Sequence, residues 1–500
     1  MKLFEVAIPP GVVRLGTELQ SSGRWWDCNL VRWVEGTLQP IGGWAALYSG
    51  VDSTHLTVTG KARAAHSWRT NSNVPFMAIG THSHLYVYTG LELFDITPVG
   101  LAPGREDTES FTGYGIGIYG RGTYGTQRQT AGATEVATTW SLDNFGQDLL
   151  AVHSDDGRLM RWLGDPAFPA LPVVATTGTI PINNKLVMVT EERFCMLLGA
   201  SGDPRRIQWS SAEDYTAWAI SAVTSAGFLT LQTPGVIKAC CKVRKQNLIV
   251  TNLDAHVANY VGYPAFYGLD RVATGCGIIG SKALESSDDV AYWMGQGGFY
   301  KYDGAVTVLP CAVREYVFNS LNIGQAEKVY AIRLPGLSSI KWFYPSGSSI
   351  ECDRYVEYNY LLDVWSFGNV ARTCGRHKGV FTYPVYVDPA GKLWAHEQGR
   401  DYTGEVPWIE SGPVEIGDGG RVYDLLQILP DERTAGQVQA RFRSRYWPNG
   451  PESAHGPYSL TSPTSIRFSG REISVRVESA GNHDWRVGRF RFDHTLRGAR

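Results

Sequence analysis

Two sets of residues in this chain have the spacing found in binding sites: one set could bind a metal ion and the other a nucleotide. His82 and His84 alternate along one strand-like run, so both imidazoles would lie on one face, where a pair of histidines can bind a metal. No third ligand follows nearby, and we predict hydrogen-bonded or surface histidines and no metal site. Gly115, Gly117 and Gly120 fit the nucleotide-binding spacing G-x-G-x-x-G, but no helix pattern follows them. We therefore predict no cofactor.

A third stretch, Ser154 to Trp162, is similar to the Asp-box motif S-x-D-x-G-x-T-W of sialidases. The match is incomplete, because glycine directly follows the aspartate and the threonine is missing. A type I′ hairpin turn at Asp156-Gly157 explains the same residues, and we favour that interpretation. The chain also has no G-x-S-x-G, H-E-x-x-H or EF-hand sequence. We predict no catalytic residues and no enzymatic activity.

Arginines alternate with phenylalanines in two runs near the C-terminus, Arg441 to Arg445 and Arg489 to Asp493. In a strand this alternation places the arginines on one face and the phenylalanines on the other. Residues 438–500 hold eleven Arg against five Asp or Glu, whereas the whole chain is near neutral with 46 Lys and Arg against 48 Asp and Glu. Three interpretations follow: pairing with carboxylates of another subunit, contact with DNA phosphate, or a solvated face.

The elements that would carry these residues are short strand pairs repeated along the chain. In seven places a strand-like run passes through a short turn into a second run with an aromatic residue. These are Leu85–Phe94, Leu149–Trp162, Phe194–Trp209, Asn247–Tyr260, Val290–Gly304, Tyr355–Trp365 and, more weakly, Lys392–Tyr402. Repetition of one strand pair at intervals of about 35 to 65 residues is typical of a β-propeller, whose blades bury their faces against each other.

The repeat predicts an all-β fold with little helix, built around a β-propeller of six or seven blades over residues 49–405. Residues 1–48 are expected to be extended and to supply a strand that closes the ring. Four aromatic side chains beside turns should be buried between blades and form its core: Trp162, Trp293, Tyr302 and Trp365.

Two further segments differ from the propeller repeat. Residues 104–136 are rich in glycine and tyrosine, which predicts a long exposed loop anchored by its tyrosines. Residues 406–500 form a basic module with strands expected at 422–429, 438–447, 465–468, 472–478 and 485–492, separated by Pro, Gly and Ser turns. This pattern favours a small antiparallel β-sandwich or barrel.

The eight cysteines and the N-terminus indicate where the chain is made. The cysteines are scattered without C-x-x-C spacing, so we expect reduced, buried thiols. Glu5, Pro9 and Pro10 interrupt the N-terminus before a signal-peptide core develops, and no apolar run has transmembrane length. We predict synthesis in a cytoplasm and no association with a membrane.

Several motifs, taken in order, resemble those of one family. They are Gly23–Gly36 with Ile41-Gly-Gly-Trp44, the tyrosine/glycine run at 114–125, Trp140–Leu150, Gln208–Trp218, Trp293–Gly304 with Leu309-Pro310, and Arg486–Arg491. Together they look like the tail nozzle (hub) proteins of tailed bacteriophages, also called packaged-DNA stabilisation proteins. The similarity extends over most of the chain.

The resemblance implies a structural virion protein of the phage tail, made in the host cytoplasm. It implies a homo-hexamer below the portal and its adaptor (head-to-tail connector) protein, with propellers around a channel through which double-stranded DNA passes. A needle or plug and tail-fibre or tailspike proteins would bind below. The alternatives are a glycan-binding or glycan-cleaving propeller, such as a receptor-binding or depolymerase tail component, and a monomeric interaction scaffold.

Two sets of residues would then lie at interfaces. Tyr114, Tyr119 and Tyr124 would dock on the adaptor or on a neighbouring subunit, because tyrosine supplies large contact area at low entropic cost. A dense arginine ladder in a DNA channel would retard ejection. We therefore place five arginines away from the channel, paired with acids of an adjacent domain or subunit: Arg441, Arg443, Arg445, Arg489 and Arg491.

Overall fold

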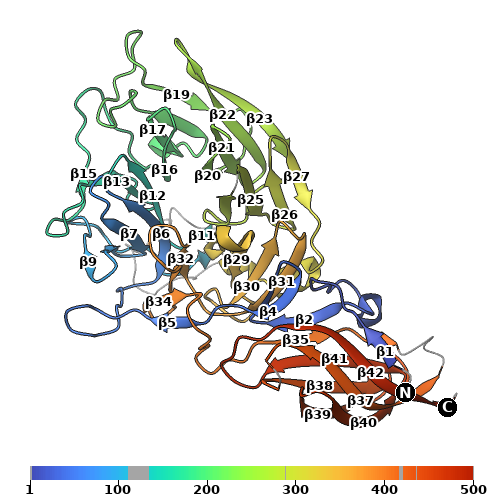
Figure 1. The fold of residues 1–500 in the computed structure, drawn as a ribbon. Coiled ribbons are helices and arrows are strands. Elements are labelled where there is room, and N and C mark those ends of the chain that lie inside the picture. Colours follow the sequence, from blue (N-terminus) through green and yellow to red (C-terminus); the bar gives the residue numbers. More distant parts are fainter. Residues whose placement is uncertain (1–2, 111–133, 288, 416–420, 435, 499–500) are drawn as a thin grey trace, which may run out of the picture.

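The computed structural model describes residues 3–110, 134–287, 289–415, 421–434 and 436–498, and these residues form an all-β protein (Figure 1). Seven four-stranded antiparallel sheets form a propeller, and two six-stranded sheets form a β-sandwich at one end of it. The predicted fold class, a β-propeller with a C-terminal antiparallel β-sandwich, is confirmed, and the described blades number seven.

Six blades are continuous in sequence. Their strands are β6–β9 (Ala62–Arg69, Pro75–Thr81, Leu85–Tyr88, Leu93–Asp95); β12–β15 (Trp140–Phe145, Asp148–His153, Leu159–Trp162, Leu171–Pro172); β16–β19 (Leu186–Val189, Cys195–Leu198, Arg206–Trp209, Gly227–Thr230); β20–β23 (Ile237–Val243, Gln246–Thr251, Asp254–Gly262, Phe266–Thr274); β24–β27 (Leu284–Ser287, Val290–Met294, Phe299–Tyr302, Val306–Leu309); and β28–β31 (Tyr330–Leu334, Ser339–Tyr344, Arg354–Asn359, Val364–Asn369). Each of the six stronger predicted hairpins is a pair of adjacent strands in one of these blades.

The seventh blade joins the two ends of the propeller. It consists of β32 (Cys374–Arg376), β33 (Val385–Val387), β34 (Leu393–His396) and β5 (Trp44–Ala46), and β5 comes from the N-terminal segment. The register pairs His396 with Trp44 and Trp394 with Ala46. The weak seventh hairpin is therefore not a hairpin of its own: only its first run is a strand, and the partner strand lies about 350 residues earlier.

Aromatic side chains fill the spaces between blades. All four predicted core aromatics are buried: Trp162, Trp293, Tyr302 and Trp365. Trp162 on the second blade packs edge-on against Phe76 on the first, with ring centroids 5.1 Å apart. Trp365 on the sixth blade contacts Phe299 on the fifth at 4.8 Å. The blades therefore bury their hydrophobic faces against each other, as the repeat predicted.

The sandwich contains strands from both ends of the chain. One sheet holds β1 (Leu3–Val6), β3 (Val31–Val34), β4 (Thr37–Pro40), β37 (Val422–Glu432), β40 (Thr464–Gly470) and β42 (Val487–Gly498); the other holds β2 (Trp25–Asn29), β35 (Trp408–Ser411), β36 (Val414–Glu415), β38 (Val438–Arg445), β39 (Ser453–Ser459) and β41 (Glu472–Ser479). All five strands expected after residue 406 are present. Residues 1–48 are not a simple extended lead, because four of their strands complete the sandwich and one completes the propeller.

Helix is scarce in the described residues. One α-helix, α1 (Arg314–Ser320), and the short 3₁₀ turns η1 (Glu18–Ser21), η2 (Ala200–Gly202), η3 (Ile323–Lys328) and η4 (Pro335–Leu337) lie between strands. No helix in these parts of the chain combines the length and hydropathy needed to span a membrane. All eight cysteines are free thiols, five of them buried and three partly buried.

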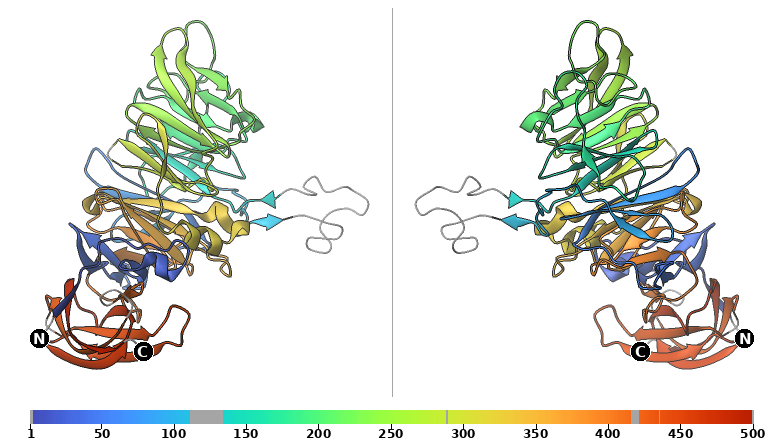
Figure 2. Two further views of the ribbon diagram at one scale, coloured as in Figure 1. Left: turned by 90° about the vertical axis from the view of Figure 1, so that its right-hand side faces the viewer. Right: turned by 90° about the vertical axis from the view of Figure 1, so that its left-hand side faces the viewer.

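A two-stranded ribbon projects from the propeller. Strands β10 (Glu109–Ser110) and β11 (Thr134–Glu135) follow the first blade, pair with each other and lead away from the blades (Figure 2). Tyr114, Tyr119 and Tyr124 belong to residues 111–133, outside the described residues, so their docking role stays a prediction.

Candidate functional site: the propeller channel and the sandwich arginines

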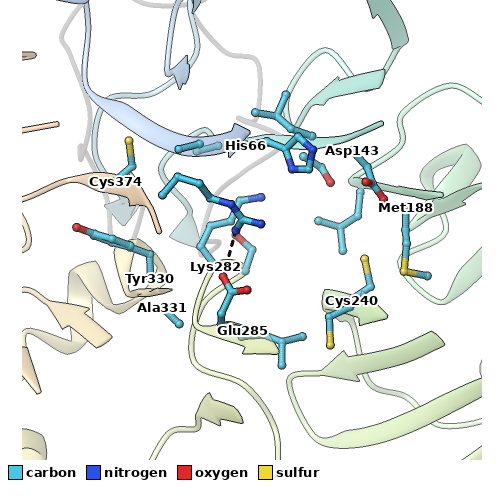
Figure 3. Close-up of a pocket in the computed structure, with 18 of the residues that line it drawn as sticks. His66, Asp143, Met188, Cys240, Lys282, Glu285, Tyr330, Ala331 and Cys374 are labelled. Atoms are coloured by element: carbon cyan, nitrogen blue, oxygen red, sulfur yellow. Dashed lines mark hydrogen bonds and ion pairs between the residues drawn. The ribbon is translucent and has the colours of Figure 1, made fainter. Parts of the chain in front are cut away.

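The first strand of every blade faces the propeller axis, where a cavity of about 410 Å³ opens. Its lining comes from β6, β12, β16, β20, β24, β28 and β32, so residues far apart in sequence meet here (Figure 3). A second cavity of about 180 Å³ continues toward the β10–β11 ribbon and shares Arg63, Leu186, Ser281 and Lys282 with the first. Together the two cavities form the propeller channel.

The carboxylates that line the larger cavity are both held by cations or backbone donors. Glu285 accepts a hydrogen bond of 3.2 Å from Arg376 and lies 4.0 Å from Arg333. Asp143 accepts from the backbone N–H of Val189 at 2.8 Å and lies 3.9 Å from Lys242. A glycan-cleaving site needs one carboxyl group that stays protonated near neutral pH. Here both carboxylates instead serve as acceptors for neighbouring cations and a backbone N–H.

One histidine that lines the channel, His66, and one that follows the lining residue Arg376, His377, are held in the neutral form. Burial lowers the pKa of His66 to about 4, even though Asp143 opposes the shift, and its ring bonds to the side chain of Asn144. Burial and the nearby Arg376 and Arg333 lower the pKa of His377 to about 3. Neither imidazole carries the proton that a general acid would need at neutral pH.

The stretch similar to an Asp-box lies in the turn between β13 and β14. Asp156 holds Arg158 through two bonds of 2.6 Å, and Gly157 has φ +70° while Asp156 does not have a positive φ. The predicted type I′ turn is therefore wrong, because that turn needs a positive φ at both central residues. The backbone instead closes a wider turn, in which Gly157 N–H donates to the His153 carbonyl at 2.8 Å.

The two histidines considered as metal ligands make ordinary hydrogen bonds. His82 Nδ1 accepts from the backbone N–H of Lys61 at 3.0 Å, and His84 Nδ1 bonds to the Ser83 hydroxyl at 2.8 Å. Throughout the described ranges, no three His, Cys, Asp or Glu side chains converge in a way that could hold a metal ion.

The sandwich arginines alternate with buried phenylalanines, as the sequence predicted. Phe442, Phe490 and Phe492 are buried, whereas Arg441, Arg489 and Arg491 are exposed. Arg441 bonds to Glu478 on the neighbouring strand at 2.6 Å, and Arg489 bonds to Glu5 on β1 at 2.8 Å. Both acids belong to the same sandwich, so these pairs hold its strands together.

Arg443 and Arg445 are held more tightly by the same module. Arg443 pairs with Glu410 and, at 3.1 Å, with Glu452. Arg445 is only 8% exposed and contacts Glu472 at 2.6 Å and Glu18 at 3.1 Å. The prediction paired Arg445 with acids of an adjacent domain or subunit, and the acids around its guanidinium are Glu18, Glu452 and Glu472 of its own chain. The part of that prediction that placed Arg445 against another subunit is therefore wrong.

Arg491 differs from the other four arginines. It is exposed, and it forms no ion pair with any of the described residues. Among the five predicted arginines it is the one whose charge remains available to a partner.

A buried ion cluster that the sequence did not predict connects the sandwich to the propeller. Arg32 on β3 reaches Glu397 after β34 at 2.6 Å and Glu357 on β30 at 3.6 Å, and Lys341 on β29 reaches Glu357 at 3.2 Å. Burial alone would raise the pKa of Glu357, but Arg32 and Lys341 outweigh it and hold that pKa below its ordinary value. Arg32 lies inside the Gly23–Gly36 motif, which was the only sequence signal for this cluster.

The Ile41-Gly-Gly-Trp44 motif follows that cluster and has a steric explanation. A Cβ atom on Gly42 would come within 2.3 Å of the Glu397 Cα, and one on Gly43 within 2.5 Å of the Asp401 carbonyl oxygen. Trp44 then stacks on His396 with ring centroids 5.2 Å apart. Glycine is needed twice because the N-terminal segment runs directly against the backbone of the seventh blade.

Comparisons with known proteins identify no family. No family model matches the chain, and no curated protein matches it. Among solved structures, PorZ of the Porphyromonas gingivalis type-IX secretion system is 9% identical, with a TM-score of 0.35, over 76% of this chain and 44% of PorZ. BamB from Moraxella catarrhalis is 12% identical, with a TM-score of 0.32, over 72% of this chain and 95% of BamB. The dihydro-heme d1 dehydrogenase NirN is 10% identical, with a TM-score of 0.34, over 86% and 79%.

Proposed function

We propose that this protein is a structural subunit of a bacteriophage tail, a nozzle or hub protein that assembles into a hexameric ring below the portal and its adaptor. In that ring the propellers would surround the passage for DNA and retain packaged DNA. Other tail proteins, a needle or plug and fibres or tailspikes, would attach below.

The observation that most supports this proposal is the path of the N-terminal motif segment. Residues 25–40 form three strands of the sandwich, and residues 44–46 then complete the seventh blade. Cys28 on β2 also donates a 3.1 Å hydrogen bond to the Phe367 carbonyl on β31 of the sixth blade. The motif on which the resemblance rests thus connects the sandwich and the propeller into one unit. Such a unit suits a subunit that must keep its shape within a ring.

The charged groups of the channel fit a scaffold better than a glycosidase. Both carboxylates that line its larger cavity are paired with cations, and the histidine that lines it, His66, is neutral. An enzyme of the alternative class would instead need an unpaired acid and a second carboxylate about 5 to 9.5 Å away.

Oligomeric state tests the proposal directly. Mass photometry of the purified chain, followed by two-dimensional cryo-EM classes, should show a six-membered ring of 55.1 kDa subunits, alone or on addition of an adaptor ring. A chain that stays monomeric with the adaptor present and cleaves polysaccharide would overturn the proposal.

A further inference from the structure

The strongest unassigned feature of the described residues is Lys282, whose side chain enters the propeller channel. Its backbone is fixed, since Lys282 O accepts a 2.8 Å hydrogen bond from the Ala331 N–H of the next blade. Figure 3 shows the side chain in the same space as His66, Cys240 and Glu285, which come from three other strands. Lys282 also borders both cavities, so it lies where they join.

The ammonium group of Lys282 makes no hydrogen bond or ion pair with the described residues. The other cations that line the larger cavity all do: Arg63 with Glu351, Lys242 with Asp143, and Arg333 and Arg376 with Glu285. Lys328, a fully buried lysine nearby, shows the usual arrangement, with Asp107 at 2.5 Å and the Ile350 carbonyl at 2.9 Å. Lys282 as a whole is only partly buried, so its ammonium borders the open space of the cavity without such a partner.

The surroundings of Lys282 carry excess positive charge. Five cationic side chains line the larger cavity (Arg63, Lys242, Lys282, Arg333 and Arg376) against two carboxylates. Burial lowers the pKa of Lys282 to about 8, and the positive charge of Arg376 adds to the effect. Arg333 and Arg376 share one carboxylate, Glu285, so the positive charge beside Lys282 is only partly balanced. The ammonium of Lys282 is the cationic donor at the cavity that lacks an acceptor among the described residues.

We propose that the propeller channel is a binding site for a small phosphate-type oxyanion, with Lys282 as its central ligand and the positive charge of Arg376 and Arg333 beside it. An oxyanion would supply the acceptor that the Lys282 ammonium lacks, and arginine and lysine are the usual side chains for phosphate. A cavity of about 410 Å³ is of the size that holds small molecules and is far too small for a DNA duplex. Phosphate binding at this site does not require that the chain forms the proposed ring.

Isothermal titration of the full chain with inorganic phosphate tests this site, with citrate as a carboxylate ligand for comparison. The wild type should bind phosphate more tightly than citrate, and Lys282→Gln should weaken phosphate binding at least about tenfold, the lower end for loss of a charge-assisted bond. Lys301→Gln is the matched control, because Lys301 lies on β26 in an exposed pair with Asp303. It should bind phosphate like the wild type.

A second measurement uses only the wild-type chain, in case Lys282→Gln fails to fold. Brief acetylation with a small reagent, read by peptide mass spectrometry, should modify Lys282 more slowly in phosphate than in chloride of equal ionic strength, while Lys301 is unaffected. Absence of phosphate binding by the wild type, equal binding by Lys282→Gln, preference for citrate, or unchanged acetylation of Lys282 would each overturn the proposal. All of these readouts are independent of whether the chain forms a hexamer.

Discussion

The guanidinium of Arg32 donates a hydrogen bond of 2.6 Å to the carboxylate of Glu397, and this contact joins the sandwich to the seventh blade. Arg32 lies on β3, whereas Glu397 directly follows β34, 365 positions later. Glu397 also accepts from the Gly42 N–H at 2.9 Å, next to the strand that closes the ring. One carboxylate therefore fixes both the sandwich and the closing segment.

Replacing Arg32 with Met should destabilise the whole chain. The variant would leave Glu357 buried, with Lys341 as its remaining cation, and breaking a buried pair costs about 3–5 kcal/mol. Urea denaturation should show the loss, and the double variant Arg32→Met/Glu357→Gln should recover part of it. Arg205→Met, at a partly exposed arginine 3.7 Å from Asp203, is the control and should change stability by no more than about 1 kcal/mol. Equal urea midpoints for Arg32→Met and wild type would contradict the role of this cluster.

The cost of Arg32→Met should shrink in acid. Arg32 and Lys341 hold the pKa of Glu357 below its ordinary 4.5, so the stabilisation from its ionised form is present above that pH and is lost as pH falls. Stability curves of wild type and variant should therefore converge below about pH 4.5. A difference that stays constant from neutral pH to pH 3 would show that Glu357 does not respond to Arg32.

Truncating Trp293 should weaken the fifth blade. Its side chain is fully buried and its indole N–H donates to the Cys276 carbonyl at 2.7 Å, so Trp293→Ala should cost about 3–5 kcal/mol. Thermal unfolding should show a clear fall in melting temperature, whereas Trp447→Ala, at a residue 57% exposed, should change it little. A melting temperature within about a degree of wild type would contradict the assignment of this blade.

Two arginine substitutions should separate folding from assembly. Arg445→Glu would place a second buried acid beside Glu472 and should unfold the sandwich. Arg491→Glu alters an exposed residue and should leave thermal stability unchanged, yet reduce the hexamer fraction in mass photometry if this arginine meets a neighbouring subunit. If the hexamer fraction of Arg491→Glu equals that of the wild type, Arg491 does not lie at the proposed interface.

The tyrosines between β10 and β11 can be tested in the same assay. Changing Tyr114, Tyr119 and Tyr124 together to Ser should preserve the melting temperature, because the strands of the seven blades lie elsewhere in the chain, but weaken assembly with the adaptor or a neighbouring subunit. The matched control replaces Tyr263, which is 75% exposed on the β22–β23 turn, with Ser. Normal assembly of the triple variant would limit the segment to a passive role.

The sequence determined those features that depend on neighbours in the chain. Period-two alternation and a turn place Trp293 and Tyr302 on the same face of one hairpin, and the same rule separates Arg441 from Phe442. Six hairpins, the five main C-terminal strands and the scarcity of helix in the described residues follow from such patterns. They could be predicted because the hydrogen bonds that define a hairpin connect residues a few positions apart.

Only the tertiary structure decided the contacts between distant segments. Three examples are the pairing of β5 with β34, the ion cluster of Arg32, and the ion pairs of Arg445 with Glu18 and Glu472. In each of them no local sequence pattern indicates which residues will be partners. The propeller channel is the extreme case, because each blade contributes one strand to it and Lys282 meets Arg376 from another blade. Whether a charged side chain finds an opposite charge or remains without one is set by how the ring closes, since closure alone brings those seven strands around one axis.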